Sequence, residues 1–263
     1  MLSTNYVAGV PNWVDLATTD VDAAAAFYRA VFGWQFQSAG PDAGGYGMLT
    51  LDGKTVAAVG PLMEQGATPS WTLYFQTEDA DATANAVRQA GGGVRADPFD
   101  VFTQGRMGQF SDPSGGNFAV WQPGDTKGLD NVNEPGTLCW AELHTADAAG
   151  AKSFYHAVFG WATQDVPMGG FSYTLIRPRG GGEESSFGGM MPLDRQMTAA
   201  GMTTTWRAYF EVADCDAAVA KTAEHGGTVV MPAQDVPEVG RMAWLGDPAG
   251  AAFSVITSVA ADQ

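Results

Sequence analysis

Three residues with chemically useful side chains occupy alternate positions in one short segment: Trp140, Glu142 and His144. Alternate side chains of an extended strand point to the same face, so these three share a face. A neighbouring carboxylate raises the pKa of an imidazole and burial lowers it, and such a pair can act as a general base in a proton transfer. The segment therefore offers Glu142 and His144 as candidate catalytic groups. The alternative is a structural hydrogen-bonded pair.

The same segment occurs earlier in the chain in a modified form. Trp13 and Asp15 precede Trp140 and Glu142 by 127 positions (140 − 13), but Ala17 occupies the position of His144. Tryptophan supplies a wide π-surface and one N–H donor, which suits a flat apolar or aromatic ligand. The copies thus predict two unequal sites, each with a tryptophan and a carboxylate, of which only the second has an imidazole.

Tyr74 and Arg106 recur as Tyr209 and Arg241, at an offset of 135 (209 − 74). They are candidate ligand-binding groups, because tyrosine donates hydrogen bonds to carbonyls and arginine anchors anions. Core packing explains the tyrosines equally well, and ion pairs with nearby carboxylates explain the arginines. The ligand-binding candidates are Trp13, Asp15, Tyr74, Arg106, Trp140, Tyr209, Glu211 and Arg241.

The elements that must position these residues are also repeated. Alternating residues predict a strand at 13–18, an acidic residue at Asp20 or Asp147 can cap the following helix, and Gly33 or Gly160 can end it. Each half is predicted to contain the order strand, helix, strand, strand, strand two times. The sequence predicts an α+β fold with domains at residues 1–125 and 137–263, joined by a linker at 126–136 that is rich in Pro, Gly, Asp and Asn.

Composition excludes several classes of function. The chain has 263 residues and a formal net charge of −16, so binding to nucleic acid or to an anionic membrane would begin with repulsion. No segment approaches the roughly 20 apolar residues of a membrane span, and the N-terminus has no signal-peptide pattern. We expect a cytoplasmic protein whose two cysteines, Cys139 and Cys215, are reduced. No dinucleotide or phosphate-binding motif occurs in a supporting context, so we expect no cofactor.

The order and spacing of these motifs resemble the vicinal oxygen chelate superfamily, which includes glyoxalases, bleomycin resistance proteins and extradiol dioxygenases. The matching text is Phe27-Tyr28 to Phe32-Gly33-Trp34 and Asp112-Pro113 with their second copies, and it covers essentially the whole chain. The labels glyoxalase-like and hydroxylase are used for two-domain actinobacterial members of this type. The resemblance implies paired βαβββ modules that form two half-open barrels.

The resemblance also implies three metal-ligand positions in each half. They fall on Trp13, about Thr72 and Ala119 in the first half, and on Trp140, about Arg207 and Ser254 in the second. None of these side chains is a usual ligand of a divalent ion. We therefore expect no metal site of the family type.

Three interpretations of function remain open. The first is a metal-independent protein that binds an aromatic or apolar metabolite or antibiotic, in resistance or secondary metabolism. The second is a cofactor-free enzyme of polyketide metabolism, such as an isomerase, a cyclase or a hydroxylase-associated protein, with Glu142 and His144 as acid–base groups. The third is a regulatory interaction protein. We expect a monomer or a weak homodimer, because an intrachain pair of domains can replace the dimer of single-domain relatives.

Overall fold

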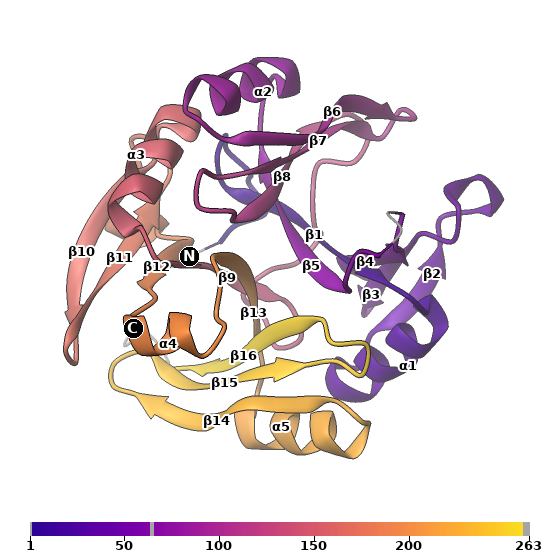
Figure 1. Ribbon diagram of the computed structural model, residues 1–263. Coiled ribbons are helices and arrows are strands. Elements are labelled where there is room, and N and C mark those ends of the chain that lie inside the picture. The colour runs from indigo at the N-terminus through magenta and orange to yellow at the C-terminus, as the bar shows by residue number, and fades with distance from the viewer. Residues whose placement is uncertain (1, 64–65, 260–263) are drawn as a thin grey trace. The chain divides into compact units, whose positions relative to one another are not determined.

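A computed structural model describes residues 2–63 and 66–259. It contains the strand–helix–strand–strand–strand pattern four times, as the sequence predicts (Figure 1). The first half consists of β1 (Pro11–Thr18), α1 (Val21–Phe32), β2 (Gln35–Ser38), a 3₁₀ turn at Pro41–Ala43, β3 (Gly47–Leu51), β4 (Lys54–Pro61), β5 (Ser70–Gln76), α2 (Ala80–Gln89), β6 (Gly93–Val101), β7 (Gly105–Ser111) and β8 (Asn117–Pro123).

The second half repeats this order and adds a short helix before its second module. It consists of β9 (Leu138–Thr145), α3 (Ala148–Phe159), β10 (Ala162–Met168), β11 (Phe171–Arg177), a 3₁₀ turn at Glu183–Ser185, β12 (Gly188–Pro192), α4 (Arg195–Ala199), β13 (Thr205–Glu211), α5 (Cys215–Glu224), β14 (Thr228–Val236), β15 (Gly240–Gly246) and β16 (Ala252–Ser258). Strands β1–β8 belong to one open sheet and β9–β16 to another, which confirms the α+β class.

Of the four main helices, α1 and α3 begin and end where the sequence predicts, for local reasons. Asp20 accepts a hydrogen bond from the Ala23 amide at 2.9 Å, and Asp79, Asp147 and Asp214 cap the other three helices in the same way. Each carboxylate satisfies an amide that the first helical turn leaves without a partner. Gly33, at φ +82°, ends α1 in a left-handed conformation that glycine adopts without strain.

The chain forms two compact units, and each unit draws on both halves of the sequence. The first unit comprises Met1–Trp13, Thr72–Gly128 and Trp140–Arg207, and the second comprises Val14–Trp71, Leu129–Cys139 and Ala208–Gln263. In the first unit, the strand order is β5-β8-β7-β6 in one sheet and β10-β11-β12-β9 in the other. In the second unit, it is β2-β3-β4-β1 and β13-β16-β15-β14. Figure 1 shows α2 over β6 and β7, and α5 against β14.

A buried hydrogen-bonded triad joins the two sequence halves within the first unit. The Trp206 indole N–H donates to the Tyr155 hydroxyl at 2.8 Å, and that hydroxyl donates to Oδ2 of Asp112 at 3.1 Å. Burial raises the pKa of Tyr155, and the nearby Asp112 raises it further, so the phenol stays protonated and remains a donor. Asp112 belongs to the first half and the other two residues to the second.

The second unit contains the reciprocal triad. The Trp71 indole donates to the Tyr28 hydroxyl at 2.9 Å, and Tyr28 donates to Asp247 at 3.2 Å. Burial raises the pKa of Asp247, although backbone amides and Tyr28 donate to its carboxylate and oppose that shift. The Asp-Pro turns that the sequence repeats therefore also hold the two halves together, which a turn signal alone does not indicate.

Candidate functional site

The candidate catalytic residues lie in the first unit, on β9, and are joined by a tyrosine from β11. Nε2 of His144 lies 2.8 Å from Oε1 of Glu142. The Tyr173 hydroxyl donates to Oε2 of Glu142 at 2.8 Å and accepts a hydrogen bond from the Trp140 indole at 2.9 Å. His144 and Glu142 are buried, whereas Trp140 and Tyr173 are partly exposed. We call these four residues the β9 cluster.

Strand β12 lies between β9, which carries Glu142, and β11, which carries Tyr173, so the tyrosine must extend across β12 to reach the carboxylate. Gly189 on β12 is the register partner of Glu142 on β9 and of Leu175 on β11. A Cβ atom at Gly189 would overlap the phenol ring of Tyr173. Glycine at this position therefore allows the ring to pass over β12 toward Glu142.

Tyr173 was not among the residues predicted from the sequence, although a signal for it was present. Tyr46 precedes it by 127 positions (173 − 46), the offset that separates Asp15 from Glu142. In the second unit, the Tyr46 hydroxyl donates to Oδ2 of Asp15 at 3.0 Å. The tyrosine–carboxylate pair is thus conserved between the two repeats of this chain, and His144 is the residue that only one repeat has.

The geometry of the β9 cluster defines the chemistry that it can perform. Both carboxylate oxygens of Glu142 receive hydrogen bonds when His144 carries its proton on Nε2. Hydrogen bonds to a carboxylate stabilise its ionised form, and burial opposes ionisation. The cluster can hold a proton at Glu142, His144 or Tyr173, and it presents the indole of Trp140 beside these groups. Both acid–base chemistry and binding of an aromatic, oxygen-bearing ligand are compatible with it.

Two further candidates, Tyr209 and Glu211, lie on β13 in the second unit. The Tyr209 hydroxyl accepts a hydrogen bond from the Trp244 indole at 2.8 Å, and Tyr209 is 1% exposed. Glu211 accepts hydrogen bonds from the backbone amide and the hydroxyl of Ser258, at 2.9 and 2.6 Å. Glu211 therefore fixes the end of β16, whereas the Tyr209 hydroxyl pairs with the indole of Trp244 on β15.

The first-half candidates Trp13 and Tyr74 lie in the first unit and are buried. The ring of Trp13 stacks on Trp121 of β8, with a centroid distance of 6.5 Å and an interplanar angle of 21°. Tyr74 on β5 is the register partner of Ala119 on β8. Trp13 lies on β1 and Tyr74 on β5, and their roles in binding stay predictions.

Both candidate arginines are held by pairs of aspartates. Arg106 forms a bidentate pair with Asp81, at 3.0 and 3.1 Å, and a further bond with Asp100 at 2.9 Å. Arg241 makes the equivalent contacts with Asp216 and Asp235. The carboxylates raise the pKa of each guanidinium. The sequence predicts such ion pairs as the alternative to ligand anchoring, and the partners of each arginine lie on a helix and on a neighbouring strand.

The two cysteines are buried free thiols of the second unit. The Cys139 thiol donates to the carbonyl of Tyr209 at 3.3 Å, and burial raises its pKa. Burial also raises the pKa of Cys215 to about 11. Both side chains are therefore protonated and unreactive at neutral pH.

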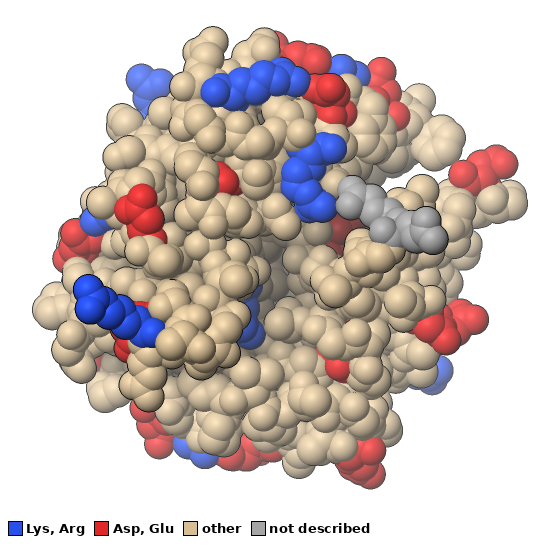
Figure 2. All heavy atoms as spheres, in the orientation of Figure 1, with Lys and Arg blue, Asp and Glu red and all other residues tan. Residues whose placement is uncertain are grey.

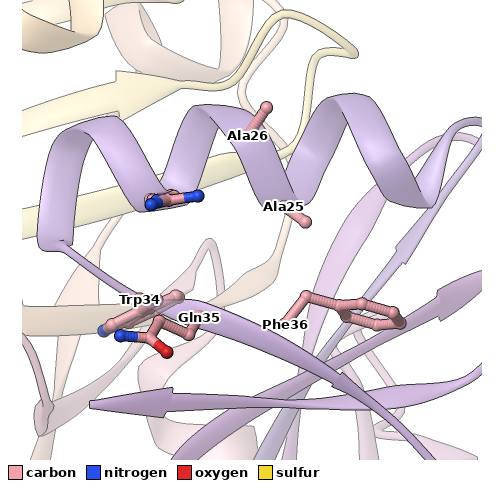
Figure 3. Close-up of a pocket in the computed structure, with 6 residues that line it drawn as sticks. Ala25, Ala26, Trp34, Gln35 and Phe36 are labelled. Atoms are coloured by element: carbon pink, nitrogen blue, oxygen red, sulfur yellow. The ribbon is translucent and has the colours of Figure 1, made fainter. Parts of the chain in front are cut away.

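A separate pocket of about 510 Å³ lies on the second unit, beside α1 and β2 (Figure 3). Ala25 and Ala26 form part of its wall from the helix, and Gln35 and Phe36 from the strand. The remaining lining residues are Arg29 and Trp34. No predicted site residue lines this pocket. In the second repeat, the counterpart of Ala25 is Lys152, whose ammonium group pairs with Asp165.

The side chains at the three implied metal positions do not suit a divalent ion. They offer indole, hydroxyl, guanidinium and methyl groups, whereas such ions prefer imidazole, carboxylate or thiolate. Within residues 2–63 and 66–259, no group of three or more His, Cys, Asp or Glu side chains is arranged to hold a metal ion. Glu142 and His144 bond to each other and contain too few donors for the family-type site.

The surface agrees with the acidic composition. Figure 2 shows Asp and Glu side chains scattered over the visible face, with the few Lys and Arg side chains separated among them. No helix in the described part of the chain is both long and apolar enough to cross a membrane.

Comparison with known proteins places these observations in context. The model of the glyoxalase/bleomycin resistance protein/dioxygenase superfamily matches residues 10–120 and again residues 137–255. "Putative glyoxylase CFP32" of Mycobacterium tuberculosis is 39% identical over an alignment of 259 residues that covers 96% of each chain. "Anthracycline biosynthesis protein DauV" of Streptomyces sp. (strain C5) is 40% identical over an alignment of 268 residues that covers 96% of this chain and 94% of that protein.

Among solved structures, an Mn(II)-bound glyoxalase from Novosphingobium aromaticivorans superposes with a TM-score of 0.65 and 16% identity, over 97% of this chain and 84% of that one. At this level of identity the likeness concerns the fold alone.

Proposed function

Because the chain belongs to the glyoxalase/bleomycin resistance protein/dioxygenase superfamily, we propose that it is a metal-independent binding protein for a planar aromatic metabolite of secondary metabolism. The β9 cluster carries this proposal. It combines a partly exposed indole with a tyrosine and a carboxylate that are fixed by mutual hydrogen bonds. An aromatic face beside a few positioned polar groups is typical of a small-molecule site.

The relatives support the choice of ligand class. DauV and "Anthracycline biosynthesis protein DnrV" of Streptomyces peucetius, which is 38% identical over 272 residues, are both named for anthracycline biosynthesis. An anthracycline contains fused rings with quinone and hydroxyl oxygens. Its rings can stack on an indole and its oxygens can accept or donate hydrogen bonds, so a hydroxylated polycyclic quinone is the ligand class that we propose.

Titration with quinizarin (1,4-dihydroxyanthraquinone) tests the proposal, with protein tryptophan fluorescence as the readout. We expect saturable quenching. Trp140→Phe keeps a ring but removes the donor to Tyr173, and we expect it to weaken binding. Trp13→Phe makes the same change at the equivalent position of the first repeat, which is also a ligand-binding candidate, and shows whether that repeat contributes to binding. The absence of saturable binding, or one stoichiometric equivalent of Zn, Fe, Ni or Mn in the purified protein, would contradict the proposal.

The buried Glu142–His144 pair favours a second candidate function, a cofactor-free enzyme that moves a proton on such a ligand. Glu142→Gln preserves the shape of the side chain and removes its basicity. In an enzyme, this variant and His144→Gln abolish turnover of a substrate while affinity stays near that of the wild type. If the protein is only a binder, neither the wild type nor these variants change the ligand chemically.

A further inference from the structure

The pocket beside α1 and β2 differs from the equivalent place in the second repeat, where a polar bridge connects the helix to the strands. There the ammonium group of Lys152 on α3 donates to Asp165 on β10 at 3.0 Å. The Thr174 hydroxyl on β11 donates to the same carboxylate at 2.6 Å. In the second repeat, long polar side chains thus fill the space between the helix and the strands.

All three members of this bridge are replaced in the first repeat. The residues 127 positions earlier are Ala25, Ser38 and Gly47 (152 − 25, 165 − 38 and 174 − 47). Alanine and serine lack the long ammonium and carboxylate side chains that span the gap between helix and strand, and glycine has no side chain. The gap therefore stays open as a pocket of about 510 Å³.

The ring of Phe36 lies where the polar bridge is missing. Phe36 on β2 is directly opposite Leu49 on β3, and Gly47 is two residues from Leu49, so these three positions share one face of the sheet. A Cβ atom at Gly47 would overlap the Phe36 ring, so glycine allows the ring to lie against β3. Figure 3 shows Ala25 and Phe36 between the helix and the strand. Phe36 is 36% exposed, so the pocket has an aromatic surface that a ligand can reach.

Arg29 adds a cation to this pocket. It lies one helical turn after Ala25 on α1, so the two side chains share a face of the helix. Arg29 is exposed, and its guanidinium has no hydrogen-bond or ion-pair partner among the described residues. The counterpart in the second repeat, His156, is engaged instead, because its Nδ1 lies 3.0 Å from the carbonyl oxygen of Trp161. A cation in the last turn of a helix is favoured by the helix dipole, but this does not account for the aromatic pocket beside it.

We infer that this pocket is a binding site for an aromatic carboxylate. The guanidinium of Arg29 binds the carboxylate through two parallel hydrogen bonds, and the aromatic body packs on Phe36 and Ala25. The volume of about 510 Å³ suits a small ligand, since such sites measure about 300–1,000 Å³. The net charge of −16 repels anions from most of the surface, so the guanidinium must supply the attraction. The inference does not depend on the proposed function, because the pocket shares no residue with the β9 cluster.

Calorimetric titration with 2-naphthoate tests the inference, and 2-naphthamide serves as the neutral ligand of the same shape. Arg29→Gln removes the cation, and Ala25→Leu narrows the pocket. The matched control is Arg88→Gln, because Arg88 also occupies the last turn of a helix, pairs with Asp97 and lies outside the pocket. Thermal denaturation of each ligand-free variant measures its unfolding midpoint.

We expect the wild type and Arg88→Gln to bind 2-naphthoate equally. Arg29→Gln should weaken this binding about 5-fold, the upper end for a solvent-exposed ion pair, and the wild type should bind 2-naphthamide more weakly by the same factor. Ala25→Leu should weaken the binding of both ligands.

Absence of 2-naphthoate binding, equal affinity of the wild type for the two ligands, or unchanged affinity in Arg29→Gln overturns the inference. A lowered midpoint of Arg29→Gln with unchanged affinity does so as well, because Arg29 then serves only the helix. Loss of 2-naphthoate binding in Trp140→Phe would place the ligand at the β9 cluster and also overturns it. Quinizarin binding is unaffected by any of these outcomes, so the proposed function is tested separately.

Discussion

Removing one hydroxyl from the buried triad of the first unit should destabilise that unit strongly. Tyr155→Phe takes away the donor to Asp112 and the acceptor of the Trp206 N–H, which lie 3.1 and 2.8 Å from the hydroxyl. A hydrogen bond to a charged group contributes about 1.5–3 kcal/mol, and an unsatisfied buried donor costs about 1–3 kcal/mol. We expect a loss of about 3–5 kcal/mol in the free energy of unfolding.

Urea denaturation followed by tryptophan fluorescence measures this loss. A double-mutant cycle with Trp206→Phe then isolates the indole–phenol bond, because the double variant no longer contains the orphaned N–H. We expect a coupling energy of about 1–2 kcal/mol between the two sites. Tyr28→Phe, which breaks the equivalent bonds to Trp71 and Asp247, is the internal comparison.

The reasoning fails if Tyr155→Phe costs less than about 1 kcal/mol, or if the cycle shows additive effects. Either result would mean that the buried polar atoms find other partners when the hydroxyl is lost.

Three further predictions concern separate residues. Thr174→Val should raise the pKa of Asp165, because the hydrogen bond from the Thr174 hydroxyl is the main cause of its lowering below 3.8. The ionised Asp165 stabilises the fold above its unfolded pKa, and this stabilisation is lost as pH falls through the folded pKa. The stabilisation should shrink in the variant, and an NMR titration of the carboxyl measures the change in pKa. Gly189→Ala should displace the ring of Tyr173 and weaken quinizarin binding as much as Tyr173→Phe does. A Gly189→Ala protein with the affinity of the wild type would contradict the role of the Tyr173 ring in binding. Arg241→Met should leave quinizarin affinity and the thermal unfolding midpoint nearly unchanged, since its ion pairs with Asp216 and Asp235 are near the surface and screened by solvent. A large loss of affinity would show that the arginine anchors the ligand.

The local elements followed directly from the sequence. The capping aspartates, the left-handed Gly33 and the alternation around Trp140 are short-range signals, because each concerns residues within about four positions of one another. The same-face placement of Glu142 and His144 depends on strand geometry alone, and the structure brings them to 2.8 Å. Their role in catalysis stays a prediction.

Other members of the site depend on contacts that no local pattern specifies. Tyr173 reaches Glu142 only because Gly189 leaves room for its ring. The 127-residue offset marks Tyr46 and Tyr173 as equivalent, but it does not show that either hydroxyl meets a carboxylate. The partners of Arg106 likewise depend on which helix and strand approach it.

The sequence by itself determined the duplication, the module order and the inequality of the two repeats, because these are properties of residue identity and spacing. The tertiary structure decided which repeat supplies each partner. Asp112 of the first half accepts a hydrogen bond from the phenol of Tyr155 of the second, and Asp247 accepts one from the phenol of Tyr28 of the first. Both tyrosines are chemically equivalent donors in the sequence. Only the packing of elements from both halves into each compact unit selects one of them, because a hydrogen bond requires two atoms within about 3 Å of each other.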